Sequence, residues 1–202
     1  MVTNSMKSLK NLLFGKEFDK QISFVGLQNA GKTTLIRRLK EGVRLTTTKD
    51  DIKKQPYQPT MGLSMETFKL GLTEIVAADM GGHETFREPF WKPFVSKSAA
   101  VCFVFDSADV GKVMEAGEAI KQVLSWVRPE SCFLFLANKK DLPSALKLEE
   151  IIDKLKLKKL KQPHSFGIYQ VSALTGEGVE DSITWLGEQL FGQVAKAGNK
   201  EG

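Results

Sequence analysis

The stretch "FVGLQNAGKTTLIRRL" at residues 24–39 decides the fold of this chain. It begins as an apolar run, passes through a glycine-containing turn, and continues with apolar residues at helical spacing. Residues 26–33 fit the pattern G-x-x-x-x-G-K-[ST], in which successive N–H groups point inward and cradle phosphate oxygens. A strand before the turn and a helix after it are the context that this mechanism requires. We therefore predict a phosphate-binding loop rather than an incidental glycine-rich turn.

The residues of this loop have separate roles. The helix that follows adds the positive end of its dipole and its unpaired N–H donors. Gly31 has no Cβ to block a phosphate, Lys32 is expected to reach the β- and γ-phosphates, and Thr33 offers a hydroxyl to Mg²⁺. The expected nucleotide contacts in this region are Gln28, Asn29, Ala30, Gly31, Lys32, Thr33 and Thr34.

A second motif, "LANKKDLP" at residues 136–143, indicates the base. The carboxylate of Asp141 can accept from both N1–H and the exocyclic amine of guanine, and adenine offers no such pair of donors. Lys139 can lay its stem along the base, and Asn138 can brace the neighbouring loops. A third loop, Ser172, Ala173 and Leu174, follows the last predicted strand, and its backbone N–H groups are expected to meet the guanine O6.

Two further segments are predicted to bind Mg²⁺ and the γ-phosphate. In "AADMGGHE" (77–84), Asp79 ends a strand and can hold Mg²⁺, commonly through water. Gly81 and Gly82 leave backbone N–H groups free for the γ-phosphate and let the loop rearrange when that phosphate leaves. Thr60 lies between this loop and the phosphate loop along the chain, so its hydroxyl is a third candidate ligand of Mg²⁺.

Short apolar runs alternate with helical patterns along the chain. The predicted strands are 21–26, 99–106, 131–138 and 166–173, and the predicted helices are 31–42, 111–127, 148–156 and 178–197. Residues 61–80 are predicted to form a hairpin that turns at Gly71. Strands that are apolar on both faces are typical of a mainly parallel sheet covered by helices on both sides. The pattern predicts an α/β domain with one antiparallel edge strand.

Composition sets outer limits on function. With 202 residues and 42% hydrophobic residues, the chain has the size and composition of one globular domain. We expect no signal peptide, and Cys102 and Cys132 are interpreted as buried strand thiols in a reducing compartment. The net charge of +5 favours a solvated lysine-rich surface over an anionic partner, and we expect no nucleic-acid binding. We expect a monomer.

With these motifs in place, residues 12–192 resemble a small GTPase of the Arf/Arl/Sar family. The resemblance is carried by "LLFGKEFDKQISFVGLQNAGKTTL", "PTMG", "DMGGHE", "FWKPF", "FVFDSAD", "ANKKDLPSA" and "DSITWLGEQL". It implies a Ras-like P-loop GTPase fold with a six-stranded sheet, binding of GTP or GDP with Mg²⁺, and slow hydrolysis. It also implies exchange factors, GTPase-activating proteins and effectors as partners. On the family's pattern, Thr33 and Thr60 ligate Mg²⁺, Gly82 contacts the γ-phosphate and His83 orients water, so the expected catalytic residues are Lys32, Gly82 and His83.

The chain departs from the family's pattern at five places. Gln28 stands where Asp is usual, which removes a negative charge beside the phosphates; we expect nucleotide binding to persist and the response to partners to change. His83 replaces the usual Gln, as in the Sar branch, and a surface histidine without a role is the alternative. Val2 replaces the glycine that N-myristoylation needs. Ala78 replaces a usual tryptophan, and the loop before Thr60 is longer than usual.

The resemblance predicts three parts of the chain: an amphipathic N-terminal helix and linker (1–18), a GTPase domain (19–194) and a flexible tail (195–202). Residues 2–14 place Val2, Met6, Leu9, Leu12 and Leu13 on one helical face. Without an acyl chain, so short a helix would bind membranes weakly and reversibly, and a permanently packed helix is the alternative. We expect a cytoplasmic protein that associates reversibly with membranes. Residues 40–59 are predicted to form a long loop.

Two functions remain open at this point. The first is a regulatory GTPase that recruits effectors, at membranes in vesicle trafficking. The second is a GTP-binding interaction module with negligible hydrolysis, similar to the β-subunit of a membrane receptor, which Gln28 and His83 motivate. A nucleotide kinase should show a lid and an arginine-rich acceptor site, and neither is visible. The sequence does not separate the Arf, Arl and Sar branches.

Overall fold

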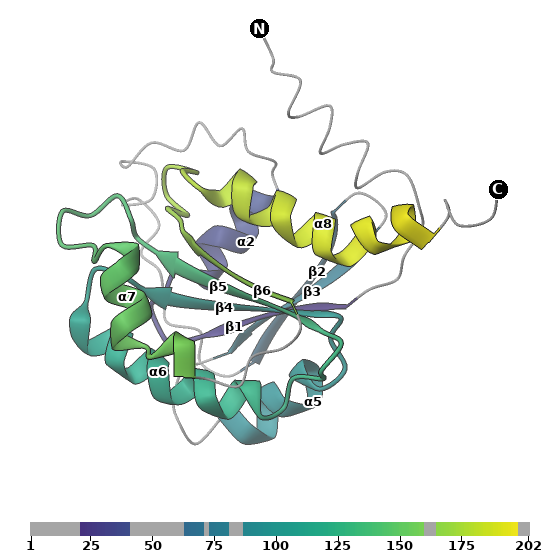
Figure 1. Cartoon of the computed structure of the whole chain (residues 1–202), viewed down its shortest axis with the longest axis horizontal. Coiled ribbons are helices and arrows are strands. Elements are labelled where there is room, and N and C mark those ends of the chain that lie inside the picture. Colours follow the sequence, from purple (N-terminus) through teal and green to yellow (C-terminus); the bar gives the residue numbers. More distant parts are fainter. Residues whose placement is uncertain (1–20, 41–62, 71–72, 81–86, 160–164, 198–202) are drawn as a thin grey trace, which may run out of the picture.

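The computed structural model describes residues 21–40, 63–70, 73–80, 87–159 and 165–197 (Figure 1). The expected N-terminal helix, most of the loop at 40–59, and the candidate residues Thr60, Gly82 and His83 lie outside the described residues. None of the helices in the described ranges is both long and apolar enough to cross a bilayer.

Four strands form a parallel sheet. They are β1 (Ile22–Gly26), β4 (Ala100–Asp106), β5 (Cys132–Asn138) and β6 (Ser165–Gln170), in the order β1-β4-β5-β6. Every residue of β1 and β5 is buried, whereas β6 lies at the edge and is mostly half-buried. The apolar runs of the sequence therefore become the central strands, because only strands covered on both faces bury side chains of both orientations.

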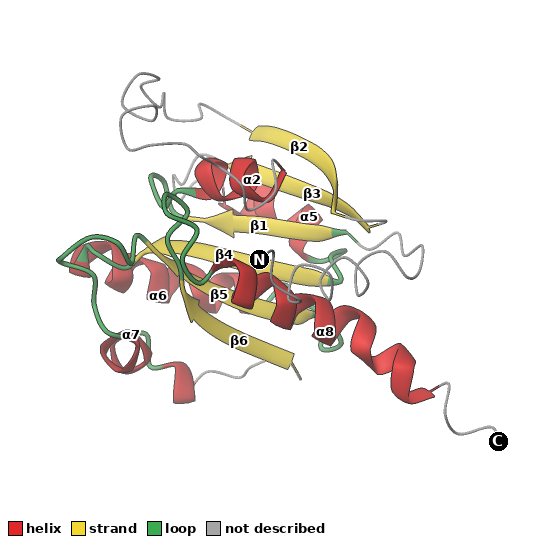
Figure 2. Cartoon of the chain, turned by 90° about the horizontal axis from the view of Figure 1, so that it is seen from above, coloured by secondary structure: helices red, strands yellow, loops and turns green. Residues whose placement is uncertain are grey.

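The hairpin predicted at 61–80 is present. β2 (Leu63–Leu70) pairs antiparallel with β3 (Thr73–Met80), and β3 runs beside β1 (Figure 2). Hydrogen bonds group the described strands into a sheet of four and a pair of two. The single six-stranded sheet with an antiparallel edge is therefore not confirmed.

Helices cover both faces of the parallel sheet (Figure 1). On one face, α2 (Lys32–Lys40) and α8 (Val179–Ala197) pack on the first cluster of buried side chains. On the other face, α5 (Lys92–Val95), α6 (Val110–Leu124) and α7 (Leu148–Lys154) pack on the second. A π-helical turn, η1 (Arg87–Trp91), precedes α5, and a 3-10 turn, η2 (Leu157–Lys159), follows α7. α8 runs past residue 194, where we expect the domain to end.

Alternate residues of each central strand enter opposite cores. In β4, Cys102 and Val104 belong to the cluster under α2 and α8, whereas Phe103 and Phe105 belong to the cluster under α6. The two cysteines are free and buried. Burial raises the pKa of the Cys102 thiol, with a smaller contribution from Cys132. The two cores hold the sheet rigid, and with it the loops at its carboxyl edge.

Candidate nucleotide-binding site

The predicted site residues gather at the carboxyl edge of the parallel sheet. β1 ends at Gly26, directly opposite Val104 of β4, and Asp106 at the end of β4 lies opposite Asn138 at the end of β5. In open α/β sheets, this edge is where ligands bind, because the loops that leave neighbouring strands meet there. The phosphate-binding loop (26–33), the loop at residues 138–141, called the NKKD loop below, and the third loop (172–174) thus converge although they are far apart in the sequence.

The backbone of the first loop needs its glycines. Gly26 has φ +150°, and a Cβ there would lie 1.9 Å from the Val104 carbonyl oxygen on the neighbouring strand. Gly31 has φ +88°, and a Cβ there would lie 2.3 Å from Nδ2 of Asn138. Asn29 adopts a left-handed φ of 59°, which asparagine tolerates better than most residues. The chain can therefore make this turn and approach Asn138 only with glycine at positions 26 and 31.

Lys32 folds back over the loop that precedes it. Its ammonium donates to the carbonyl oxygens of Gly26 at 3.0 Å and Leu27 at 2.8 Å, and the side chain is only 4% exposed. A buried ammonium is costly unless acceptors surround it. The loop therefore places one positive charge at the start of α2, where the helix dipole is also positive. Gln28 and Asn29 are exposed at the rim of the loop.

Asn138 joins two of the loops. Its Nδ2 donates to the Ala30 carbonyl at 2.7 Å, and its Oδ1 accepts from the Ala173 N–H at 2.9 Å. The side chain is buried, so both bonds are protected from water. One amide thereby fixes the distance between the phosphate-binding loop and the third loop. Any ligand spanning these two loops meets a site that is already assembled.

Asp141 is held ready to accept hydrogen bonds. The hydroxyl of Ser172 donates to Asp141 Oδ1 at 2.7 Å, and the same hydroxyl oxygen accepts from the Thr175 N–H at 3.0 Å. Asp141 remains half-buried, whereas Ser172 is fully buried. A carboxylate fixed in this way presents its remaining lone pairs in one direction, as recognition of a paired donor edge requires.

Arg38 connects α2 to the third loop. Its Nε donates to the Ala173 carbonyl at 2.6 Å and its Nη2 donates to the Leu174 carbonyl, and the residue is 2% exposed. Gly176 makes room for it, because a Cβ at that position would lie 2.7 Å from Nη1 of Arg38. The third loop is therefore fixed by an arginine as well as by Asn138. Of its backbone amides, Ser172 N–H donates to the Glu177 carbonyl and Ala173 N–H to Asn138.

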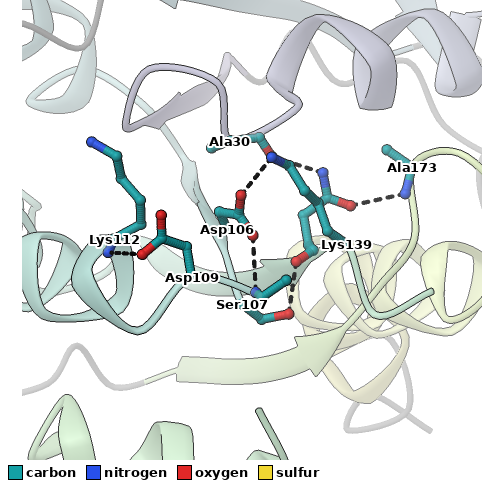
Figure 3. A network of polar contacts seen from close by, with 9 residues as sticks. Ala30, Asp106, Ser107, Asp109, Lys112, Lys139 and Ala173 are labelled. Carbon is teal, nitrogen blue, oxygen red and sulfur yellow. Dashed lines mark hydrogen bonds and ion pairs between the residues drawn. The ribbon is translucent and has the colours of Figure 1, made fainter. Parts of the chain in front are cut away.

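A second set of contacts links the loop after β4 to the NKKD loop (Figure 3). Lys139 forms a 2.5 Å ion pair with Asp106, and the Ser107 hydroxyl donates to the Asn138 carbonyl at 2.7 Å. Lys139 itself has a left-handed φ of 70°. The strand end, the NKKD loop and the phosphate-binding loop therefore form one hydrogen-bonded unit.

Comparisons with known proteins agree with this geometry. A model of the ADP-ribosylation factor family, Arf, matches residues 6–190. The chain belongs to the Arf family. Among solved structures, it is similar to the Arl6 BBS3 small GTPase from Trypanosoma brucei with the bound nucleotide analogue GppNp. That match has 30% identity and a TM-score of 0.69, and covers 86% of this chain and 98% of the other. The resemblance drawn from the motifs is thus confirmed, as is the α/β Ras-like fold.

The Arf family consists of small GTPases, so this chain carries the framework of a GTP-binding regulatory switch. Of the three candidate Mg²⁺ ligands, Thr33 lies in the first turn of α2 and Asp79 lies within β3, one residue before its end. Thr60 is outside the described residues, as are Gly82 and His83. Thr33 at the start of α2 and Lys32 over the loop fit a site for Mg²⁺ and phosphate oxygens.

Arg87 begins η1, the next described element after β3. Arg87 is buried and forms a 3.0 Å ion pair with Glu115 of α6, and its guanidinium carbon lies 5.8 Å from the centre of the Trp91 ring. The ion pair thus fastens the π-helical turn η1 to α6. Such turns are frequent at functional sites.

Sequence reasoning missed Arg38, Asp106 and Ser107. Asp106 and Ser107 lie within "FVFDSAD", which carries part of the family resemblance. This motif could have indicated both residues, but it did not show what they do. Arg38 lies on a helix next to Arg37, which is exposed. The sequence alone does not show which of the two arginines is buried.

Proposed function

We propose that this Arf-family protein is a regulatory switch that binds GTP and GDP with Mg²⁺, hydrolyses GTP slowly and recruits effectors in its GTP state. The observation that carries the proposal is the double hydrogen bond of Asn138 to Ala30 and Ala173. It unites a phosphate-binding loop with a base-binding loop. A phosphate-binding loop alone would fit ATP equally well. Asp141 lies in the same loop as Asn138, next to the phosphate-binding loop, and its carboxylate supports guanine as the base.

The geometry of the loop supports binding of the phosphates. Lys32 offers positive charge without a large rearrangement, because its buried ammonium already lies against the Gly26 and Leu27 carbonyls. Backbone N–H groups of the loop would supply further donors. At the base, Asp141 accepts from the guanine edge and the stem of Lys139 lines one side. Gln28 and the neighbouring exposed Asn29 contribute to the rim, where a regulatory partner would approach.

Mg²⁺ would be held by Thr33, Thr60 and Asp79, commonly through water at Asp79. When bound, the ion neutralises charge on the β- and γ-phosphates. Gly82 donates its backbone N–H to the γ-phosphate, and His83 orients the attacking water. Lys32 and the loop amides stabilise the charge of the transition state. None of the arginines in the described part of the chain is evident as an arginine finger, so we expect turnover to need an activating protein.

Membership of the Arf family also supports the proposal of three kinds of partner: exchange factors, GTPase-activating proteins and effectors. We propose that residues 2–14 bind membranes reversibly in the GTP state and that the protein acts in vesicle trafficking from the cytoplasm. Flotation with anionic liposomes tests this step. More protein should float with a non-hydrolysable GTP analogue than with GDP; equal flotation would contradict the membrane switch and leave nucleotide binding intact.

The guanine assignment is tested by Asp141→Asn. The variant should lose retention of GTP and GDP because an amide presents an N–H to the guanine donors. Asp153→Asn, which alters an exposed carboxylate on α7, is the matched control and should bind as the wild type does. Lys32→Ala should also lose loading. Retained GDP binding by Asp141→Asn would contradict the base assignment.

Gln28 and His83 support one alternative function, a GTP-binding interaction module with negligible hydrolysis. Release of phosphate over long incubations, with and without cell extract, separates the two. A switch should release phosphate slowly alone and faster with extract, and His83→Ala should remove both activities. Stoichiometric GTP binding without phosphate release under either condition would favour the interaction module.

A further inference from the structure

The Asp106 carboxylate has a defined orientation at the end of β4. Its Oδ1 accepts from the Ala108 N–H at 2.9 Å, and its Oδ2 accepts from the Lys139 ammonium at 2.5 Å. The side chain of Asp106 is only 14% exposed and that of Lys139 is 31% exposed. A charge-assisted bond that is partly shielded from water is stronger than an ion pair on an open surface. Asp106 therefore holds the far end of the Lys139 side chain.

The backbone of Lys139 is held by Ser107, the residue that follows Asp106. Ser107 donates both its N–H, at 2.9 Å, and its hydroxyl, at 2.7 Å, to the Asn138 carbonyl. That carbonyl belongs to the peptide bond that leads into Lys139. Because Lys139 has a φ of 70°, an uncommon conformation for lysine, the bonded peptide keeps the backbone where it would not remain by propensity alone.

The phosphate-binding loop lies next to Lys139, in addition to Asp106 and Ser107. Asn138, next to Lys139, donates to the Ala30 carbonyl at 2.7 Å. In Figure 3, Lys139 extends from the NKKD loop toward the phosphate-binding loop, with its ammonium beside Asp106. Its aliphatic stem is thus stretched between two anchors before any ligand arrives. A lysine side chain free to rotate would lose that freedom only on binding, at a cost to affinity.

We propose that Asp106 is a positioning residue for nucleotide retention: it holds Lys139 extended as a preformed wall of the base site. This inference rests on the proposed guanine-nucleotide binding and adds a residue that acts through Lys139 rather than on the nucleotide. Asp106 governs how long the nucleotide stays bound. Asp141 governs which base is accepted.

A double-mutant cycle tests the proposal with full-length protein. The rate of release of a fluorescent GDP derivative in Mg²⁺ buffer is measured for wild type, Asp106→Asn, Lys139→Met and the double variant. Asp109→Asn is the matched control, because Asp109 lies in the same loop but accepts from the Lys112 N–H as the N-cap of α6 (Figure 3). Thermal unfolding without nucleotide is recorded for every variant.

Asp106→Asn should release GDP about tenfold faster, the effect of losing one hydrogen bond between charged groups. In the Lys139→Met background the same substitution should change the rate less than twofold, because the group it positions is gone. Asp106→Asn should keep the preference for guanine over adenine. Asp109→Asn should leave the unfolding temperature and the release rate close to those of the wild type, because asparagine caps a helix N-terminus about as well as aspartate.

Three results would overturn the proposal: release by Asp106→Asn within twofold of wild type, an equal acceleration with and without Lys139, or equal acceleration by Asp109→Asn. Should Asp106→Asn fail to fold, Asp106→Glu replaces it in the cycle, since it keeps the charge and displaces it by one methylene; the same criteria apply. A wild-type protein that retains no GDP would instead overturn the proposed function itself.

Discussion

At the scale of single residues, the site depends on close approaches that leave no space for extra atoms. Gly31 passes so near Asn138 that a Cβ would lie 2.3 Å from its Nδ2, the nitrogen that donates to Ala30. The absence of a side chain at position 31 and the hydrogen bond from Asn138 are thus two parts of one contact. A substitution at Gly31 therefore disturbs the NKKD loop as well as the phosphate-binding loop.

Gly31→Ala should lower the free energy of unfolding by about 1–3 kcal/mol, because alanine is strained at φ +88° and its Cβ displaces the Asn138 amide. It should also lose GDP retention. Urea unfolding and nucleotide release measure the two effects. Gly117→Ala in α6 is the control, since a Cβ there meets Leu155 Cδ2 at an ordinary 3.5 Å, and it should not destabilise the protein. Equal stability of both variants would contradict the contact.

The residues that the sequence could indicate are those whose chemistry is local. Gly31, Lys32 and Thr33 follow one another, and Asn138 to Asp141 occupy one turn, so their spacing already has a meaning. Asp106 and Lys139 are 33 residues apart, and Arg38 and Ala173 are 135 apart. Which charged side chain reaches which loop depends on strand order and register. A single sequence does not show these.

At the scale of secondary-structure elements, α2 both begins at the phosphate loop and supports the third loop through Arg38. The strands at 21–26, 99–106 and 131–138 were predictable within about a residue because their side chains are apolar on both faces. The π-helical turn η1 was not, because five residues that include Pro89 carry no periodic pattern. Grouping of the strands into sheets of four and two depends on hydrogen bonds that composition does not encode.

Arg38→Met should destabilise the protein by about 3 kcal/mol, since it removes two hydrogen bonds from a charged donor and leaves the Ala173 and Leu174 carbonyls without it. Arg37→Met changes the neighbouring exposed arginine of the same helix and should cost clearly less, under about 1 kcal/mol, because water screens the contacts of an exposed arginine. Urea unfolding of the nucleotide-free proteins compares them. Similar losses in both variants would show that charge on α2 matters and that the contact does not.

The central strands should shield their thiols. Cys102 is fully buried in β4 and Cys132 is 5% exposed in β5, and burial raises the pKa of Cys102 above its ordinary value of 9.0. Since the thiolate is the reactive form, the native protein should react with a thiol reagent far more slowly than the protein in urea, where both cysteines should react at pH 8. Rapid reaction of two thiols in native buffer would contradict the packing of β4 and β5.

At the scale of the whole molecule, two cores hold a parallel sheet whose carboxyl edge carries three loops joined by Asn138, Arg38 and Asp106. A ligand that binds this joined edge stabilises the folded state by mass action. GDP at about 100 times its dissociation constant should add about 2.7 kcal/mol and raise the unfolding temperature by about 5–10 °C. ATP at the same concentration should leave it unchanged. A calorimetric scan measures both, and equal shifts would contradict guanine selectivity.

We propose that one joined set of loops, linked by Asn138, holds a guanine nucleotide. The most direct test of this proposal is to denature the full-length protein after purification in Mg²⁺ buffer and to identify the released nucleotide by chromatography. The wild type should release close to one GDP or GTP per chain, and Lys32→Ala should release none. Protein that is folded yet releases no nucleotide and takes up none when GDP is added, or that releases adenine nucleotide in equal amount, would contradict it.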